Sequence, residues 1–98
     1  MTIRPIQRLL VTGGAGFIGS AFIRYLLGPE VNFGGLCLNF DLLTYAGNLQ
    51  NLSSVASDSR YFFVRGDINH EKHLCHLVEE HAIDTIIHFA AESHVDRS

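Results

Sequence analysis

Apolar residues along this chain fall into short, nearly continuous runs that alternate with stretches of helical spacing. The runs cover residues 9–11, 36–40, 61–64 and 85–89, and each is followed by small or polar residues. Short runs of this kind are typical of strands that are buried on both faces of a parallel sheet. The pattern therefore predicts four strands.

The stretches between the runs predict helices. A first helix begins at Phe17 and is stopped by Gly28 and Pro29, the usual end signals. The apolar side chains that recur along it are Phe17, Ile18, Ala21, Phe22, Tyr25 and Leu26. A second helix is expected to begin near residue 70. One face of that helix carries Leu74, Leu77, Val78 and His81. Residues 42–59 are rich in Asn and Ser, and we expect one short helix there, around residues 49–55.

Strands that alternate with helices indicate an α/β protein with a parallel sheet covered on both faces. The right-handed crossover rule narrows the topology to a doubly wound Rossmann sheet, of which this chain supplies the first four strands. In the usual strand order 3-2-1-4-5-6, the fourth strand becomes an edge if the chain stops there. We expect Ile86, Ile87 and Phe89 to present apolar backbone to solvent at that edge, which would make the isolated chain poorly stable and prone to pairing.

Composition and charge exclude several classes of protein. The chain has 98 residues, 47% of them apolar, and a formal net charge of -3. This charge and the lack of a basic run argue against a nucleic-acid partner. No stretch approaches the roughly 20 apolar residues of a membrane span, and the N-terminus lacks the apolar segment of a secretion signal. Two isolated cysteines, Cys37 and Cys75, suit a reducing compartment. We expect a cytoplasmic protein that does not bind membranes.

Three glycines mark the junction between the first strand and the first helix. Gly13, Gly16 and Gly19 follow one another at a spacing of three. In a dinucleotide-binding loop, one glycine permits the sharp turn, one lets the backbone approach a pyrophosphate, and one lets the helix pack closely on the strand. The phosphates would then face free N–H groups at the helix N-terminus, where the helix dipole favours negative charge.

A carboxylate follows the second strand at the spacing that such a site requires. Asp41 lies 22 residues after Gly19, close to the ~20 expected of an acidic residue that binds the adenine ribose. The alternative interpretation is a turn residue that merely ends the strand. The glycine loop upstream favours the ribose role. Since a carboxylate would repel a 2′-phosphate, NAD is favoured over NADP.

A second carboxylate, Asp67, follows the third strand. Strand ends on the carboxyl side of a doubly wound sheet line the cofactor crevice. Asp67 could therefore accept a hydrogen bond from the adenine amino group, or it could cap the helix that begins near residue 70. The residues alone leave both interpretations open.

Three segments resemble one enzyme family. Residues 12–19 (TGGAGFIG) resemble the Thr-Gly-x-x-Gly-x-x-Gly loop of the extended short-chain dehydrogenase/reductases. Residues 41–49 (DLLTYAGNL) and 88–98 (HFAAESHVDRS) resemble the ends of strands two and four in the dTDP-glucose 4,6-dehydratases of that group. The resemblance runs from about Leu9 to Ser98 and corresponds to the N-terminal part of such an enzyme. One departure is Leu42, where the family usually has lysine.

The resemblance implies an NAD-dependent lyase of nucleotide-sugar metabolism. Such enzymes oxidise the sugar C4 hydroxyl with tightly held NAD, eliminate water across C5 and C6, and return the hydride to C6. Phe17 and Ile18 would contact the NAD pyrophosphate through their backbone, and Ser93 would contact dTDP-glucose or a similar sugar nucleotide. The adenosine ribose would be surrounded by Asp41, Leu42, Leu43 and Thr44. The adenine would be held by Asp67 and Ile68. The nicotinamide side would be lined by Phe89, Ala90, Ala91 and Glu92.

No catalytic residue is assigned within the chain. The family's Tyr-x-x-x-Lys pair and its Asp-Glu pair would lie beyond Ser98, and none of Tyr25, Tyr45 and Tyr61 has lysine four residues later. Without such a base the sugar hydroxyl cannot be deprotonated as hydride leaves. We therefore expect residues 1–98 to be an NAD-binding part without a substrate domain and without turnover of its own. The resemblance also implies that the intact enzyme forms a homodimer through later helices.

The histidines invite other interpretations. His70, His73 and His76 lie close to Cys75, but their spacing spreads them around a helix, so no metal site is expected. We expect His88 to be a hydrogen-bonded core residue and His94 to have a structural role. Two alternative functions stay open: a sugar-nucleotide epimerase or decarboxylase of the same superfamily, and a non-catalytic NAD-binding module.

Overall fold

The four expected strands form one parallel sheet. The computed structural model describes residues 6–42 and 49–89. The strands are β1 (Arg8–Thr12), β2 (Leu36–Asp41), β3 (Tyr61–Arg65) and β4 (Thr85–His88), and their order in the sheet is β3-β2-β1-β4. The predicted fold class and strand order are confirmed.

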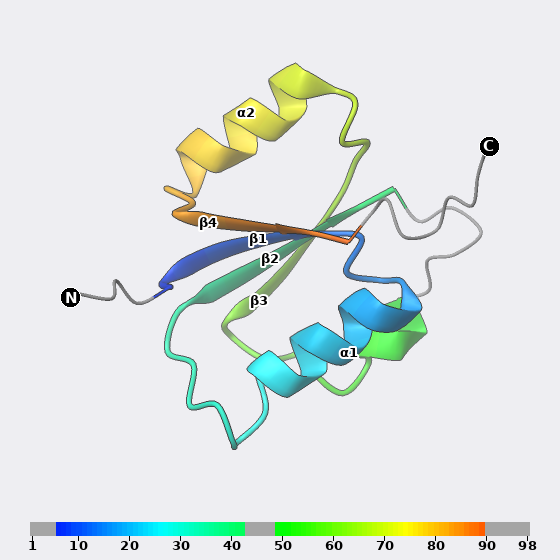
Figure 1. The fold of residues 1–98 in the computed structure, drawn as a ribbon, viewed down its shortest axis with the longest axis vertical. Helices are drawn as coiled ribbons and strands as arrows, with labels where there is room; N and C mark the ends of the chain where they lie inside the picture. Colours follow the sequence, from blue (N-terminus) through cyan, green and yellow to red (C-terminus); the bar gives the residue numbers. More distant parts are fainter. Residues whose placement is uncertain (1–5, 43–48, 90–98) are drawn as a thin grey trace.

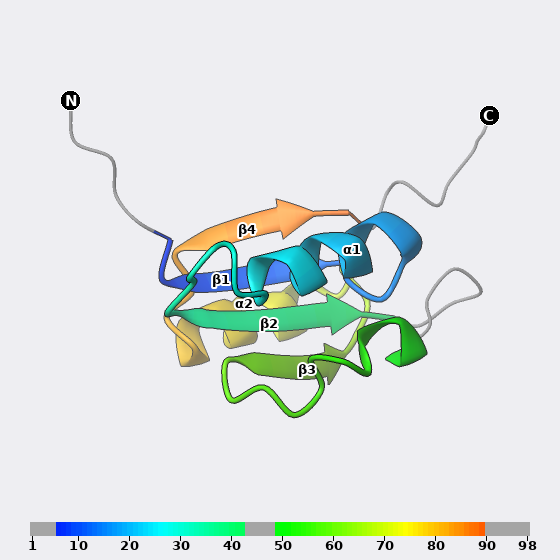
Figure 2. The same ribbon diagram turned by 90° about the horizontal axis from the view of Figure 1, so that it is seen from below.

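Helices lie on both faces of this sheet. One face carries α1 (Phe17–Leu26) and the 3-10 helix η1 (Leu49–Leu52), and the other carries α2 (Glu71–Glu80) (Figure 1). Within the described ranges, no helix is long and apolar enough to cross a membrane. The crossovers bring the carboxyl ends of the strands and the start of α1 to the same edge of the sheet (Figure 2).

The sheet separates two apolar cores. Side chains of successive strand residues point to opposite faces, so β1, β2 and β3 contribute to both cores. The core on the α1 side is built from Leu9, Val11, Ile23, Leu27, Cys37, Leu52 and Val55. The core on the α2 side is built from Leu10, Leu38, Phe40 and Leu77. The central strands β1 and β2 therefore read as nearly continuous apolar runs in the sequence.

The buried face of α1 is not the one that carries most of its apolar residues. Its buried residues are Gly19, Ser20 and Ile23, whereas Phe17, Ile18 and Tyr25 are exposed. The six apolar positions of this helix fall within about half of its circumference, and of them only Phe22 and Leu26 pack against the core. Packing against the sheet selects the face that carries the small residues, because only they allow the helix to approach the strand end closely.

The short helix predicted at residues 49–55 is a 3-10 helix that ends at Leu52 and continues as turns. Leu52 and Val55 both reach the α1-side core, so the predicted apolar contact exists without α-helical geometry. Ser and Asn side chains compete with the helix for backbone hydrogen bonds, which favours turns in this stretch.

Strand β4 lies at the edge of the sheet, as expected, but only part of it faces solvent. Ile86 has half of its surface exposed. The side chains of Ile87 and Phe89 pack against the α1-side core. The ring of Phe89 lies 5.6 Å from that of Phe22 on α1. The helix therefore shields one face of the edge strand.

Arg60, which precedes β3, joins segments at the amino-terminal ends of the strands, which we call the amino edge of the sheet. Its guanidinium donates hydrogen bonds to the carbonyl oxygens of Leu27 (2.8 Å) and Phe33, which lie on either side of the turn between α1 and β2. Arg60 also pairs with Asp58, and this contact lowers the pKa of the Asp58 carboxyl to about 2. One arginine thus holds the end of α1, the entry to β2 and the entry to β3 together.

Asp84 fastens the same edge on the other side of the sheet. Its carboxylate accepts hydrogen bonds from the N–H groups of Gln7 (3.2 Å) and Arg8 (3.1 Å), and its own N–H donates to the carbonyl oxygen of Arg8 (2.9 Å). The Arg8 guanidinium donates to the carbonyl oxygen of His81. These contacts join the beginning of β1 to the beginning of β4.

We predict that the two cysteines react with thiol reagents at very different rates. Cys37 is fully buried in β2, and burial raises the pKa of its thiol to about 12, whereas Cys75 is exposed on α2. Because the thiolate is the reacting form, a colorimetric thiol assay at mildly alkaline pH should detect one thiol per folded chain and two in denaturant. Cys75→Ser should abolish the fast reaction. Two fast thiols in the folded chain would contradict the buried position of Cys37.

Candidate dinucleotide site

A tight turn joins β1 to α1 where the strands end. We call this side of the sheet, formed by the carboxyl ends of the strands, the carboxyl edge. Gly13 has a φ of 75°, a left-handed conformation that favours glycine. The N–H of Gly13 donates to the carbonyl oxygen of Phe40 on β2 (3.1 Å), and the N–H of Gly16 donates to the carbonyl oxygen of Gly13 (3.2 Å). The turn is therefore anchored to β2 before the helix begins.

Gly19 permits the closest contact in this turn. A Cβ atom at Gly19 would lie 2.3 Å from the carbonyl oxygen of Gly13 and 2.9 Å from the Cα of Gly14. Both neighbours are backbone atoms that cannot rotate away. Gly19 is therefore the glycine of the loop that lets the helix pack closely on the strand.

Gly14 is a further close-packed glycine, and the sequence analysis did not identify it. A Cβ atom there would lie 2.3 Å from Oδ1 of Asn39 and 2.6 Å from Cδ1 of Ile23. Asn39 is fully buried, its Nδ2 donates to the hydroxyl of Tyr61 (3.1 Å), and its Oδ1 has no hydrogen-bond partner among the described residues. The sequence held one signal for this contact, because Asn39 is a polar residue within an otherwise apolar strand.

The start of α1 presents backbone N–H groups at this edge. Gly16 is the N-cap and makes no side-chain capping bond, and the first turn of the helix contains no acidic residue. The first N–H of α1 with a helical acceptor is that of Ser20, bonded to the carbonyl oxygen of Gly16 (2.9 Å). The N–H groups of Phe17, Ile18 and Gly19 therefore lack helical acceptors, as expected of the first helical residues. Such a helix start binds phosphate well.

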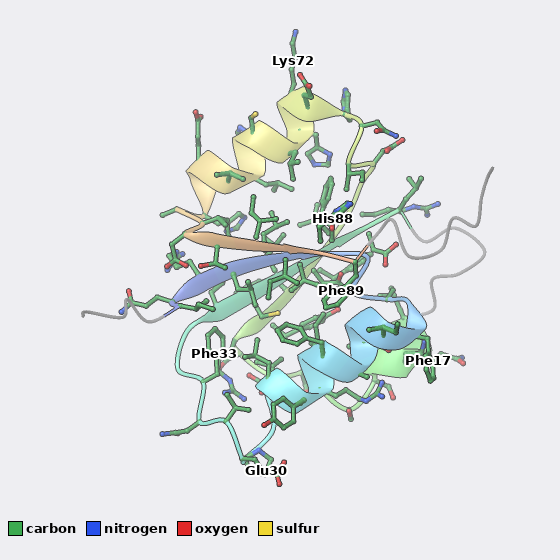
Figure 3. All side chains as sticks on the ribbon, viewed as in Figure 1. Phe17, Glu30, Phe33, Lys72, His88 and Phe89 are labelled. Atoms are coloured by element: carbon green, nitrogen blue, oxygen red, sulfur yellow. The ribbon has the colours of Figure 1, made fainter. Side chains whose placement is uncertain are left out.

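The exposed side chain of Phe17 does not block these N–H groups. Figure 3 shows it directed outward from the start of α1, away from the sheet, and 83% of its surface is exposed. The implied contact of Phe17 through its backbone is therefore sterically open.

Asp41 ends β2 next to the glycine turn. Its Oδ2 accepts a hydrogen bond from the N–H of Ala15 at 2.8 Å. This bond holds the carboxylate at the carboxyl edge, on the same side of the sheet as the start of α1. The structure thus brings the glycine turn and the Asp41 carboxylate together. Both were expected to bind the same dinucleotide.

Asp67 and Ile68 lie in the connection that leaves β3. The Asp67 carboxylate accepts a hydrogen bond from the N–H of Asn69 (2.9 Å), and the N-cap of α2 is His70. The alternative interpretation of Asp67 as the helix cap is therefore wrong, because the helix begins three residues too late. The half-buried side chain of Ile68 packs against the α2-side core.

A polar contact from η1 supports the turn, and sequence reasoning missed it. Nδ2 of Asn51 donates to the carbonyl oxygen of Ala15 (3.3 Å), while the carbonyl oxygen of Asn51 accepts from the guanidinium of Arg24 on α1 (2.7 Å). Asn51 thereby joins η1 to both the turn and the helix. Its position in an Asn- and Ser-rich stretch concealed this role.

Other predicted positions lie at the edge of the described ranges or outside them. Leu42 follows β2 and has 41% of its surface exposed. Phe89 follows β4 and its N–H donates to the carbonyl oxygen of Thr12 (2.8 Å). The positions that fall outside the described residues are Leu43, Thr44, Ala90, Ala91, Glu92, Ser93 and His94.

The histidines of the described ranges are spread over α2, its two ends and β4. His88 was expected in the core, but it is exposed, because β4 is an edge strand; its Nδ1 is hydrogen-bonded to Oγ1 of Thr12 at 2.6 Å. Figure 3 shows His88 and Phe89 on opposite faces of the sheet. His76 lies 3.3 Å from the Glu80 carboxylate. Within residues 6–42 and 49–89, no group of three His, Cys, Asp or Glu side chains could hold a metal ion.

Comparison with known proteins gives matches over most of the chain. The sequence profile described as GDP-mannose 4,6 dehydratase matches residues 10–98. A probable dTDP-glucose 4,6-dehydratase from Sinorhizobium fredii is 52% identical over 92 residues, and a dTDP-glucose 4,6-dehydratase from Salmonella typhimurium is 45% identical over 92 residues. Each match covers 94% of this chain and 25% of the relative. The chain thus spans about a quarter of the length of these relatives.

A solved structure supports the same comparison. The crystal structure of DesIV, a dTDP-glucose 4,6-dehydratase from Streptomyces venezuelae with NAD bound, superposes with a TM-score of 0.80 at 53% sequence identity. The match covers 94% of this chain and 29% of that one.

Proposed function

Because the chain belongs to the GDP-mannose 4,6 dehydratase family, whose profile it matches over residues 10–98, we propose that it is the NAD-binding part of a dTDP-glucose 4,6-dehydratase. In this proposal residues 1–98 form the N-terminal part of the NAD-binding domain, and the substrate domain lies outside this sequence. The names of its relatives favour dTDP-glucose as the sugar nucleotide.

The observation that carries the proposal is the position of the start of α1 beside Asp41. The free N–H groups of Phe17, Ile18 and Gly19 lie at the same edge as a carboxylate that is held by the N–H of Ala15. A diphosphate on the helix start would place the attached ribose toward the end of β2, within reach of a carboxylate one strand away. The residues that are present therefore fit a dinucleotide.

Each part of the cofactor has a proposed group of residues. Gly13, Gly16 and Gly19 shape the turn around the pyrophosphate, Asp41 and the residues after it surround the ribose, and Asp67 with the backbone of Ile68 binds the adenine. Phe89 and the residues after it line the nicotinamide, and Ser93 contacts the sugar nucleotide. When bound, NAD supplies the hydride acceptor for oxidation at the sugar C4. This chain binds and orients, and the residues that move protons lie outside it.

The whole protein carries further proposals. We place it in the cytoplasm, the compartment that its two free cysteines suit, and we propose that it forms a homodimer. Its product distinguishes it from an epimerase or a decarboxylase. A 4-keto-6-deoxy sugar nucleotide supports the dehydratase, whereas an epimerised or decarboxylated sugar with an intact C6 hydroxyl would contradict it.

A titration followed by amide NMR tests NAD binding by the 98-residue chain. NAD should shift the signals of residues 15–19 and of Asp41, while signals at the amino edge of the sheet stay unchanged. NADP should produce smaller shifts at equal concentration, because its 2′-phosphate meets the Asp41 carboxylate. Local shifts report even low affinity, which is expected of a chain that spans a quarter of its relatives. Unchanged signals at residues 15–19 with saturating NAD would refute the proposal.

A further inference from the structure

An arginine lies next to the carboxylate at the carboxyl edge. Arg65 is the last residue of β3 and is paired in register with Asp41, the last residue of β2. Neighbouring strands of a sheet lie about 4.8 Å apart. The two residues therefore leave the sheet side by side, at the edge where α1 begins (Figure 2).

The alternation of side chains along β3 places Arg65 on the α1 side of the sheet. Tyr61 packs against the α1-side core and Val64 packs against the α2-side core. Because side chains alternate along a strand, Arg65 emerges on the same face as Tyr61. This is also the face on which Asp41 meets the N–H of Ala15.

Arg65 differs from the other arginines of the described ranges. Arg8, Arg24 and Arg60 each donate a hydrogen bond to a main-chain carbonyl oxygen and so tie segments of the chain together. Arg65 is exposed and has no hydrogen bond or ion pair with any residue that the structure describes. Its guanidinium is therefore not needed to hold the fold.

We propose that the Arg65 guanidinium stacks on the adenine ring of the bound dinucleotide. This inference rests on the proposed function. A ribose held by Asp41 and an adenine edge held by Asp67 require the adenine ring to cross the end of β3, where Arg65 emerges. A planar guanidinium binds the face of an aromatic ring well, and a lysine ammonium does not reproduce this geometry.

The neighbouring carboxylate favours the adenine over a 2′-phosphate as the partner of Arg65. A 2′-phosphate would stand on the ribose beside the negative charge of Asp41, whereas the uncharged adenine ring meets no such repulsion. The arginine charge also offsets the Asp41 charge at this edge. Arg65 thus increases affinity for the adenosine half of the dinucleotide without favouring NADP over NAD.

Substitutions of Arg65 test this contact in the 98-residue chain titrated with NAD. Arg65→Ala should weaken NAD binding about threefold to tenfold, the range for one exposed to partly buried cation–π contact. Arg65→Lys should lose most of the same factor. Lys72→Ala removes an equal charge from an exposed side chain that points away from the sheet at the start of α2 (Figure 3), and should leave binding unchanged. Circular dichroism should show all three variants folded like the parent chain.

A second measurement reports the contact directly. Nuclear Overhauser effects should connect the Arg65 side chain with the adenine protons of bound NAD. Equal NAD affinity in the parent chain and in Arg65→Ala would overturn the inference while leaving the proposed function intact. A loss confined to NADP would overturn it as well, in favour of a phosphate contact. A parent chain that binds no NAD would refute the proposed function and this inference together.

Discussion

Replacing Gly19 with alanine is expected to cost the chain both stability and NAD affinity. The added Cβ would lie 2.3 Å from the carbonyl oxygen of Gly13 and 2.9 Å from the Cα of Gly14. Overlap with backbone atoms has to be relieved by moving α1 away from the turn. Overpacking of this kind costs about 1–3 kcal/mol, which corresponds to a fall in melting temperature of about 4–8 °C per kcal/mol in a domain of this size.

The displacement also separates the N–H groups of Phe17, Ile18 and Gly19 from the turn that orients them. We therefore expect NAD affinity to fall about tenfold or more. Thermal unfolding followed by circular dichroism measures the first effect, and the NMR titration measures the second.

Gly34→Ala is the matched control for this substitution. No atom lies within 4 Å of the position that its Cβ would occupy, so the melting temperature and NAD binding should stay close to those of the parent chain. A Gly19→Ala chain with unchanged melting temperature and unchanged affinity would show that α1 and the turn do not pack as described.

Replacing Asp41 with alanine is expected to produce the second large loss. The substitution removes the carboxylate proposed to bind the ribose hydroxyls and the acceptor of the Ala15 N–H. A hydrogen bond to a charged group contributes about 1.5–3 kcal/mol, so NAD affinity should fall about tenfold to a hundredfold. Calorimetric or NMR titration of the variant gives the factor.

Asp41→Asn separates the two roles of this carboxylate. The amide oxygen can still accept the Ala15 N–H bond, so the turn should keep its amide chemical shifts, while the charge that repels a 2′-phosphate is gone. We expect the preference for NAD over NADP to shrink. Glu30→Gln, which removes a carboxylate in the connection beyond the end of α1 (Figure 3), should change neither affinity. If Asp41→Asn kept the full preference for NAD, Asp41 would not be the residue that selects the cofactor.

The sequence was sufficient to predict features that depend on residues near one another in the chain. The apolar runs located all four strands, with differences of one residue at some ends. The glycine spacing located the turn, and the distance to Asp41 located the carboxylate beside it. These features follow from local backbone geometry and from the topology of a right-handed parallel sheet.

Features that depend on contacts between distant residues were missed. The side of α1 that meets the sheet is decided by how closely Gly19 approaches Gly13, and the spacing of Phe17 and Tyr25 does not reveal that distance. Gly14 needs its small size because of Asn39, which is 25 positions away in the sequence. Asn51 reaches Ala15 from η1. None of these pairs has a recognisable spacing, because each depends on how separate elements pack in three dimensions.

The ties made by Arg60 and Asp84 lie at the amino edge of the sheet, away from the turn that begins α1. The framework is therefore braced on the side where no ligand is expected. Residues at the opposite edge can be replaced, lengthened or shortened without disturbing that bracing. This separation favours evolutionary change, because the ligand-binding loops can vary among related proteins while the contacts at the amino edge are retained.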